Sequence, residues 1–399
     1  MDKKTALPSH WEIKKMTEVV TWGSGGTPKA TEKSYYENGT IPWLIIGDLN
    51  DGIVNSSLSK ITELGLKNSS AKMIPVGTLL VAMYGSIGKL GITGIECCTN
   101  QAIAFAKELH GVTTKYMFYY MSMIKPKLIS MGKGGTQKNI SQSVLKSLDV
   151  VVPPIPEQEC IVSKIEELFS KLDASVAELQ TAKEKLKVYR QAVLKEAFAE
   201  CKVKKPIREM SSIVTSGSRG WAKYYSSDGA KFIRIGNLTR DSIKIDCSEM
   251  QYVALPENAE GTRTKLHTND VLVSITADLG SIGLVPETIG DAYINQHIAL
   301  VRFVNPEQSE FMAWYLRSDW GQKDLLKNKR GAGKLGLGLD DIRDTKVPVV
   351  SDEQAKTIVS EISARLSVCN SIQQTIETSL QQAEALRQSI LKQAFGGRL

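Results

Sequence analysis

The feature that most constrains this chain is a stretch that occurs twice. Residues 161–198 align without a gap on residues 358–395. The first copy ends Arg190-Gln-Ala-Val-Leu-Lys-Glu-Ala-Phe198 and the second ends Arg387-Gln-Ser-Ile-Leu-Lys-Gln-Ala-Phe395. A repeat at an offset close to half of the chain length indicates a tandem duplication. We therefore expect the segments between the copies to be duplicated as well.

Both copies carry the heptad pattern of a long helix with one apolar seam. Apolar residues recur every seven positions, with companions three or four positions away, which is typical of a coiled coil. In the second copy the seam is diluted by cysteine and small residues. The predicted seam residues are Ile161, Ile165, Leu168, Leu172, Leu179, Leu186 and Val193 in the first copy, and Ile358, Ile362, Ile372, Ile376, Leu386 and Ile390 in the second.

Such a helix needs a partner for its apolar stripe. A helix from Ile161 to Phe198 would be roughly 57 Å long at about 1.5 Å per residue. Neither stretch contains Pro or Gly, and Gly396-Gly397 ends the second one. The other copy is the obvious partner, so we expect an antiparallel coiled coil. The alternative is that each helix packs only on its own globular segment.

The segments before and between the copies repeat the same order of elements. Each has a strand with a Gly-containing turn, a buried strand, a strand leading into a Gly-Ser-Ile-Gly turn or its counterpart, an Asn-Gln strand, a helix and a Gly/Lys loop. Strands mixed with few helices favour an α/β module. The prediction is two tandem mixed α/β modules and two long helices with an internal pseudo-twofold repeat: module 1–156, helix 157–204, module 205–350 and helix 351–399.

Composition narrows the class of protein. The chain is 42% hydrophobic and 23% charged, as in ordinary globular proteins. No apolar run predicts a membrane span, the first residues lack a signal-peptide core, and the six cysteines show no paired spacing. We therefore expect a cytoplasmic protein with no membrane association and no metal site. Of the net charge of +7, most lies in residues 1–156, which contain 17 lysines, 11 acidic residues and no arginine.

The duplicated organisation resembles the specificity subunit of type I restriction-modification systems. Each module is followed by a Pro…Glu-Gln entry, an Ile-Val-Ser heptad start and an Arg-Gln…Ala-Phe ending. The resemblance covers the whole chain. Weaker landmarks are Gly26-Thr-Pro28, Gly85-Ser-Ile-Gly-Lys89, Thr99-Asn-Gln101 and Gly135-Thr-Gln137; in the second module the first and last of these become Ser218-Arg-Gly and Gly336-Leu-Gly.

The resemblance implies a function in DNA recognition. The modules would be target-recognition domains that each read one half-site of a bipartite double-stranded DNA target, with the coiled coil setting a non-specific spacer. A rod of roughly 57 Å would cap that separation at about 17 base pairs. Two methyltransferase subunits would dock on the repeated helices and restriction/translocase subunits would join the complex. S-adenosylmethionine, ATP and Mg would then belong to the partner subunits, and this chain would have no cofactor and no catalytic residue.

Cations and amides in Gly-containing loops are the candidates for DNA contact, because Gly lets the backbone approach phosphates closely. The first module has no arginine and must read bases largely with Lys, Asn, Gln, Ser or Thr. The candidates are Lys29, Lys89, Lys133, Gln137, Lys138 and Asn139 in the first module, and Arg219, Lys223, Lys329, Arg330 and Lys334 in the second, where Arg234 and Arg240 are further arginine candidates.

Simpler interpretations exist for the same loops. The Gly/Lys loops could be solvated and mobile, and the Gly-Ser-Ile-Gly turns could be tight connections between core strands. Buried amides such as Asn100 and Asn295 more often satisfy backbone groups than read bases.

Catalytic motifs are not supported by the sequence. Gly85-Ser-Ile-Gly-Lys89 lacks the spacing of a phosphate-binding loop, and Val152-Pro-Pro-Ile lacks the polar residue and the aromatic residue of an adenine methyltransferase motif. We therefore predict that the chain is not an enzyme. Two other functions stay open: a structural adaptor whose modules bind protein, and a methyltransferase with a divergent site. Strong salt dependence of duplex binding would separate DNA recognition from the adaptor.

Overall fold

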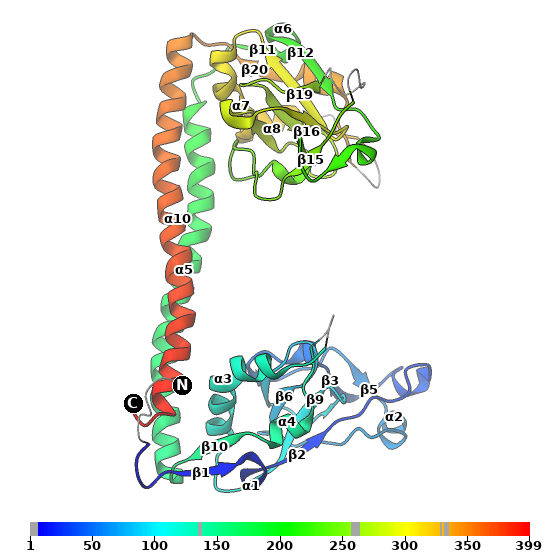
Figure 1. Cartoon of the computed structure of the whole chain (residues 1–399), viewed down its shortest axis with the longest axis vertical. Coiled ribbons are helices and arrows are strands. Elements are labelled where there is room, and N and C mark those ends of the chain that lie inside the picture. Colours follow the sequence, from blue (N-terminus) through cyan, green and yellow to red (C-terminus); the bar gives the residue numbers. More distant parts are fainter. Residues whose placement is uncertain (1–6, 135–137, 257–263, 328, 331–334) are drawn as a thin grey trace. The chain divides into compact units, whose positions relative to one another are not determined.

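The computed structural model describes residues 7–134, 138–256, 264–327, 329–330 and 335–399. The chain divides into two compact units (Figure 1). Unit 1 comprises Met1–Leu179 and Thr378–Leu399, and unit 2 comprises Gln180–Glu377. Each unit holds one α/β module and a part of both long helices, α5 (Ile155–Ala197) and α10 (Asp352–Ala394). The predicted fold class is confirmed.

The long helices begin earlier than the heptads indicate. Each has 43 residues, and α5 includes Pro156, although we expected a helix without proline. Pro156 lies in the first turn, where its missing N–H has no intrahelical partner to lose. The buried side chain of Gln158 fixes this end of the helix to module 1: its Oε1 accepts the N–H of Thr113 at 3.0 Å, and its Nε2 donates to the carbonyl of Gly111 at 2.9 Å.

Within each unit the two helices pair in opposite directions. In unit 2, Lys183 Nζ lies 3.2 Å from Glu377 Oε1, and Arg365 Nη1 lies 2.9 Å from Glu196 Oε2. In unit 1 an ion pair joins Arg387 to Asp173. Residue numbers therefore rise along α5 as they fall along α10, which confirms the antiparallel coiled coil.

The apolar seam follows most of the predicted positions. Buried seam residues include Ile161, Ile165, Leu186 and Val193 on α5, and Ile362, Ile376 and Ile390 on α10; Leu168, Leu172, Leu179 and Ile358 are half-buried. The prediction is wrong for Ile372 and Leu386, which are 44% and 50% exposed. The seven-residue row of Ile362, Cys369, Ile376 and Ile390 stays buried along α10. The companion row, to which Ile372 and Leu386 belong, is the one that turns towards solvent.

Three sheets build the module of unit 1. They are a five-stranded sheet of order β2-β9-β6-β7-β4, a three-stranded sheet of order β5-β3-β8, and the antiparallel pair β1-β10. The strands are β1 (Glu12–Lys15), β2 (Val20–Ser24), β3 (Ile41–Leu44), β4 (Gly52–Val54), β5 (Lys60–Ile61), β6 (Leu79–Ala82), β7 (Leu90–Thr93), β8 (Cys98–Thr99), β9 (Ile103–Leu109) and β10 (Asp149–Val152).

The module of unit 2 repeats most of this topology, with one strand fewer in the main sheet and one strand more in the second sheet. Its sheets have the orders β12-β19-β16-β17, β13-β15-β14-β18 and β11-β20. Thus β12, β19, β16 and β17 correspond to β2, β9, β6 and β7, which confirms the predicted duplication of the modules. The strands are β11 (Lys204–Pro206), β12 (Ser211–Ser216), β13 (Tyr225–Ser226), β14 (Ala230–Ile233), β15 (Gln251–Val253), β16 (Val271–Ser274), β17 (Ile282–Leu284), β18 (Ala292–Ile294), β19 (Ile298–Phe303) and β20 (Lys346–Pro348).

Shorter helices complete each module. In unit 1 they are α1 (Met16–Val19), α2 (Glu63–Lys67), α3 (Thr114–Met131) and α4 (Gln142–Lys146), and in unit 2 α6 (Ile207–Met210), α7 (Ser309–Arg317), α8 (Asp319–Leu325) and α9 (Leu339–Asp344). The 3₁₀ turns are η1 (Lys33–Tyr35), η2 (Ile46–Asp48), η3 (Trp221–Tyr224), η4 (Ile235–Asn237), η6 (Glu287–Ile289) and η7 (Pro306–Gln308). In both units a helix, α3 or α7, lies between the long helices and the main sheet (Figure 1).

The end of each long helix is anchored by a phenylalanine. Phe395, just beyond α10, packs edge-on against Tyr116 and Tyr120 of α3, with ring centroids 5.1 and 5.2 Å apart. Just beyond α5, Phe198 packs in the same way against α7: its ring centroid lies 5.4 Å from that of Phe311 and 5.3 Å from that of Tyr315. Module 1 is therefore held by the end of the second helix, and module 2 by the end of the first.

Candidate nucleic-acid interface

Three loops that are distant in the sequence lie side by side in unit 1. The N–H of Met83, just after β6, donates to the carbonyl of Ala102, just before β9, at 2.8 Å. The N–H of Ile140 donates in turn to the carbonyl of Met83 at 2.9 Å. These bonds bring together residues 84–89, 99–102, 133–134 and 138–139, which we call loop edge 1. They include most of the predicted DNA contacts of the first module.

The same backbone bonds occur in unit 2. The N–H of Ile275 donates to the carbonyl of His297 at 2.9 Å, and the N–H of Leu337 donates to the carbonyl of Ile275 at 2.9 Å. Residues 276–280, 294–297, 329–330 and 335–336 therefore form loop edge 2. The duplication thus preserves an arrangement of loops as well as a sheet topology.

Each Gly/Lys loop is closed at its base. Lys133 and Asn139 exchange two backbone hydrogen bonds of 3.0 and 2.8 Å, and Arg330 and Gly336 exchange two of 3.0 and 2.8 Å. The N–H of Gly85 reaches the carbonyl of Lys138 at 3.2 Å, which attaches this loop to the neighbouring turn. The side chains of Lys133, Lys138, Lys329 and Arg330 are exposed, and Asn139 is half-buried. The predicted contacts Gln137 and Lys334 lie outside the described residues.

The Gly-Ser-Ile-Gly turn is a tight connection between two core strands, which is the simpler of the two interpretations given above. It joins the antiparallel strands β6 and β7, and Gly85 and Gly88 take the positive φ angles of 63° and 72° that favour glycine. Lys89, which ends the turn, is half-buried, and its Nζ donates to the carbonyl of Ile46 at 3.4 Å. Together with Lys138 it lines a cavity of about 350 Å³, so the fold places these two predicted cations close together.

In the Asn-Gln pairs, the asparagine and the glutamine have different roles. Asn100 Oδ1 accepts the N–H of Ala102, and Asn295 Oδ1 accepts the N–H of His297, both at 3.1 Å. The asparagines therefore hold the backbone, as expected for amides at such positions. Gln101 is exposed and accepts a hydrogen bond from the hydroxyl of Thr27, which ties the loop of Lys29 to loop edge 1.

The predicted cations of module 2 are exposed but unequally anchored. Arg219 is exposed, directly before Gly220, which has a φ of 79°. Lys223 Nζ lies 4.8 Å above the ring of Tyr224. Arg330 donates from Nη2 to Asp341 Oδ1 at 3.2 Å, although its side chain is 80% exposed. All three keep charge available at the surface.

Two further residues lie near these edges: Tyr84, which was not predicted, and the candidate Arg240. Tyr84, which precedes the Gly-Ser-Ile-Gly turn, is 39% exposed, and its place before that turn is the signal that could have found it. Arg240 donates from Nε to Asp278 Oδ1 at 2.8 Å and from Nη2 to the carbonyl of Leu279 at 2.8 Å. This hydrogen bond from Arg240 lowers the pKa of Asp278 below its usual value. Arg240 therefore supports the turn in loop edge 2.

The chemistry of both edges is that of cations and hydrogen-bonding groups. Such groups suit phosphate oxygens and base edges. Within the ranges described above, no three His, Cys, Asp or Glu side chains gather as a metal site would require. Among the described helices, none is both long and apolar enough to cross a membrane.

Comparison with known proteins agrees with this arrangement. A family model for the type I restriction modification DNA specificity domain matches residues 8–184 and 214–382. The chain is similar to the specificity subunit of the type I restriction enzyme EcoBI of Escherichia coli, with 24% identity over 357 residues that cover 80% of this chain and 73% of that protein. It is 22% identical to the EcoKI specificity subunit of Escherichia coli K12 over 430 aligned positions, covering 98% of this chain and 90% of that one.

Solved structures share the fold. One solved structure, which describes the complex assembly and conformational transition of the type I R-M system, contains a chain that matches with a TM-score of 0.78 and 16% identity. The match covers 99% of this chain and 100% of that chain. The HsdS subunit from Thermoanaerobacter tengcongensis matches with a TM-score of 0.56 and 16% identity over 98% of both chains.

Proposed function

Because the chain belongs to the type I restriction modification DNA specificity family, and is a non-catalytic specificity subunit, we propose that its two units read the two halves of a bipartite duplex DNA target. Loop edge 1 would contact one half-site and loop edge 2 the other. The residues that would make these contacts are the cations and amides predicted above, with Tyr84 added.

One observation carries this proposal. The same hydrogen bonds between three loops recur in both units, while the side chains that they present differ. The bonds through Met83 and Ile275 fix the loops. Loop edge 1 presents lysines and amides but no arginine, whereas loop edge 2 presents Arg330 beside Lys329. A fixed frame with variable side chains is what two readers of different sequences require.

The difference in side chains gives a preference for bases. The arginine guanidinium pairs bidentately with guanine, which a lysine ammonium cannot copy. Module 1 lacks arginine and would read its half-site with amides and lysines, among them Gln101 and Lys133. Asn and Gln pair bidentately with adenine. Module 2 would use Arg219 and Arg330 where its half-site contains guanine.

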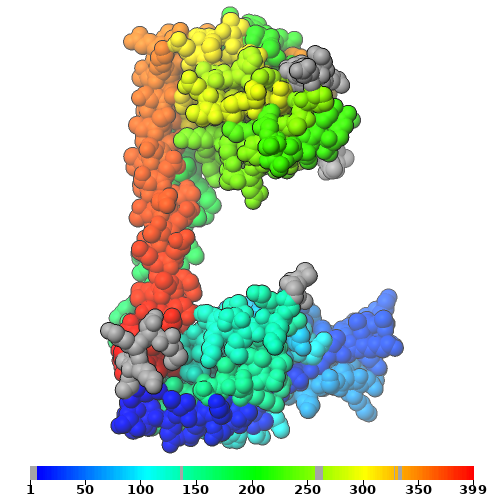
Figure 2. Space-filling view, in the orientation of Figure 1, coloured from blue at the N-terminus to red at the C-terminus, as the bar shows by residue number. Residues whose placement is uncertain are grey.

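The chain is a subunit of a type I restriction-modification complex, and the long helices are where we place its partners. Two methyltransferase subunits would dock there, one on each repeat, and restriction/translocase subunits would join them. Exposed apolar side chains support this placement: Val188 is 71% exposed, Val368 59%, Ile372 44% and Leu386 50%. Much of the surface of α10, orange to red, is visible on the face shown in Figure 2. S-adenosylmethionine, ATP and Mg would bind the partners.

The helices would also set the spacer between the half-sites. At about 1.5 Å per residue, the 43 residues of α5 form a rod of roughly 65 Å. Such a rod spans at most roughly 19 base pairs at about 3.4 Å each.

Equilibrium binding of the assembled complex to duplex DNA tests the proposal. The complex should bind a duplex containing its methylated motif more tightly than a scrambled one, and the affinity should fall steeply as salt rises. Arg330→Ala should weaken the discrimination against base changes in one half-site only. Arg343→Ala removes a cation that is not on either edge and serves as the control. Binding without salt dependence or sequence preference would contradict DNA recognition and favour an adaptor.

A further inference from the structure

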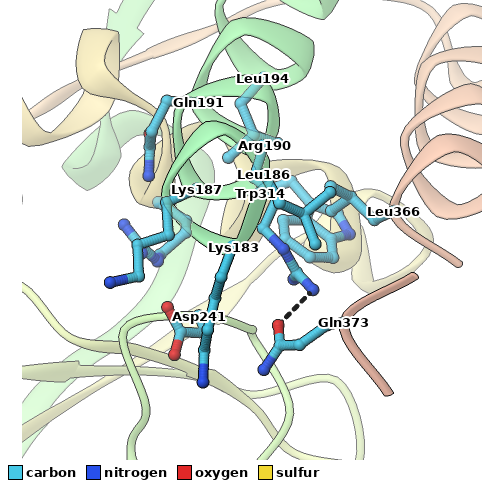
Figure 3. Close-up of a pocket in the computed structure, with 11 residues that line it drawn as sticks. Lys183, Leu186, Lys187, Arg190, Gln191, Leu194, Asp241, Trp314, Leu366 and Gln373 are labelled. Atoms are coloured by element: carbon cyan, nitrogen blue, oxygen red, sulfur yellow. Dashed lines mark hydrogen bonds between the residues drawn. The ribbon is translucent and has the colours of Figure 1, made fainter. Parts of the chain in front are cut away.

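A cationic pocket lies in unit 2, and no residue of loop edge 2 lines it. It has a volume of about 390 Å³ and opens between α5, α7 and the loop after η4 (Figure 3). Its charged and indole-bearing lining residues are Lys183, Lys187, Arg190, Asp241, Trp314 and Arg317, and we call it the arginine pocket. Four of these six side chains are cations and one is a carboxylate.

The lysines of this pocket have carboxylate partners, but the arginines do not. Lys183 lies 3.2 Å from Glu377, and Lys187 lies 2.8 Å from Glu184. In contrast, Arg190 donates from Nη2 only to neutral amide oxygens, those of Asn370 at 2.7 Å and Gln373 at 3.0 Å; the second bond is the dashed line in Figure 3.

Arg317 is the second cation of the pocket without an ion pair. It forms no ion pair with any residue that the structure describes, and its Nε is buried without a hydrogen-bond acceptor. Burial lowers the pKa of Arg317, the nearby Arg240 lowers it further, and the carboxylates of Asp241, Asp319 and Asp278 offset part of this effect. A guanidinium in such surroundings is stabilised when an anion approaches it.

Trp314 adds a neutral donor. Its side chain is only 8% exposed, and its Nε1–H is buried without an acceptor among the described residues. Buried N–H groups almost always have an acceptor, because leaving one unpaired destabilises the folded state. The pocket therefore holds two buried N–H donors, on Arg317 and Trp314, without partners.

Unit 1 contains the equivalent pocket, and its charges are balanced. That pocket has a volume of about 1300 Å³, and its three cations all pair with carboxylates that also line it. Lys115 lies 2.8 Å from Glu166, Lys125 lies 2.9 Å from Asp51, and Arg387 pairs with Asp173.

The internal repeat identifies which residues differ. Tyr120 and Tyr315 occupy equivalent positions, since each packs edge-on against the phenylalanine that follows a long helix. Two residues further along, Ser122 stands where unit 2 has Arg317. On the long helices, the constant offset places Glu384 where unit 2 has Lys187. The excess of positive charge is therefore specific to unit 2.

We propose that the arginine pocket binds a phosphate-type oxyanion, with Arg190, Arg317 and the indole N–H of Trp314 as its donors. A guanidinium presents a planar fork that fits phosphate oxygens, and charge-assisted hydrogen bonds of this kind are the strong ones. The concave shape suits a free phosphate compound or a single phosphate that protrudes from a DNA backbone. The site shares no lining residue with the loop edges and does not depend on the proposed base reading.

Calorimetric titration of the full chain with pyrophosphate, at constant ionic strength, tests the site. Saturable binding of one equivalent is expected. Arg317→Gln should weaken it by roughly 10- to 100-fold, as loss of a charge-assisted hydrogen bond does. Arg317→Lys should weaken it less, because it keeps the charge. Lys115→Gln in the pocket of unit 1 is the matched control and should leave the affinity unchanged.

A second variant keeps the proposal testable if Arg317→Gln fails to fold. Arg190→Gln removes the other guanidinium that lacks a carboxylate partner and should also weaken pyrophosphate binding. Absence of saturable binding to the wild-type chain, or equal affinity for the wild type and both folded arginine variants, would overturn the proposal. A duplex without the target motif distinguishes the sources: competition with pyrophosphate assigns the site to a backbone phosphate, and binding without competition assigns it to a free phosphate compound.

Discussion

Replacing Phe395 with alanine should destabilise unit 1 and leave unit 2 folded. Phe395 is 4% exposed and belongs to the same core as Ile165 and Leu391. Truncation of a buried phenylalanine to alanine typically costs about 3–5 kcal/mol of unfolding free energy. Edge-to-face contacts contribute about 0.5–1.5 kcal/mol each beyond burial, and Phe395 makes two, with Tyr116 and Tyr120. For domains that are stable by about 5–15 kcal/mol, this is a large loss.

Hydrogen exchange read by mass spectrometry resolves the two units. Peptides of α3 should lose protection in Phe395→Ala, whereas peptides of α7 should keep theirs. Phe198→Ala should give the reverse, because Phe198 packs on Phe311 and Tyr315. Phe395→Leu should cost about 1–3 kcal/mol, since it keeps apolar volume and loses two aromatic contacts.

Leu386→Ala is the control on the same helix. Leu386 is 50% exposed, so its truncation should change the unfolding free energy by about 0.5 kcal/mol or less. If Phe395→Ala costs no more than Leu386→Ala, or if α7 loses protection to the same extent as α3, the anchoring of module 1 by Phe395 is refuted.

Three further predictions follow from the packing and the loops. Burial raises the pKa of Cys98 from 9.0 to about 12, so iodoacetamide at pH 8 should modify the exposed Cys160 and spare Cys98. Because the unfolded thiol loses its proton near pH 9, the unfolding free energy should also fall as pH rises from 9 towards 12; rapid labelling of folded Cys98 at pH 8 would contradict the packing. Lys138→Ala should weaken binding to every duplex and reduce the salt slope by about 1. Asn139→Ala should instead cost roughly 1–3 kcal/mol of discrimination in one half-site, and equal losses on matched and mismatched duplexes would limit this loop to phosphate contacts. Seven residues added near Leu179 should lengthen the spacer and leave both half-sites intact; an unchanged spacer in the methylated motif of a folded, active variant would disprove that the long helices set the spacer.

The sequence predicts the long helices well and their contact faces less well. The heptads locate both helices because apolar periodicity is a local signal, and the repeat itself indicates that the two helices are partners. The positions of Ile372 and Leu386 were not predictable in the same way, since the buried face of α10 carries polar residues. Arg387, for example, lies with its guanidinium carbon 4.4 Å from the ring centroid of Phe169. A long cationic side chain can cover apolar surface with its stem, which a reading by hydrophobicity misses.

The candidate interface was predictable in its parts but not in its assembly. Gly, Lys and amide residues mark the loops from the sequence alone. The bonds that join Met83 to Ala102 and Ile140 connect segments far apart in the chain, and such long-range register leaves no local pattern. The proximity of Lys89 and Lys138 is a result of these bonds.

The discontinuity of unit 1 has a consequence for synthesis of the chain. All the strands of module 1 are translated before α5, yet its core includes Leu391, Ala394 and Phe395. Unit 2, in contrast, is complete once Glu377 has been made. The ribosome therefore finishes the second unit before the first. A nascent chain that stops short of residue 391 would expose the aromatic side chains of Tyr116 and Tyr120 to chaperones and proteases. Premature termination therefore leaves an incomplete core in module 1, the module that is synthesised first.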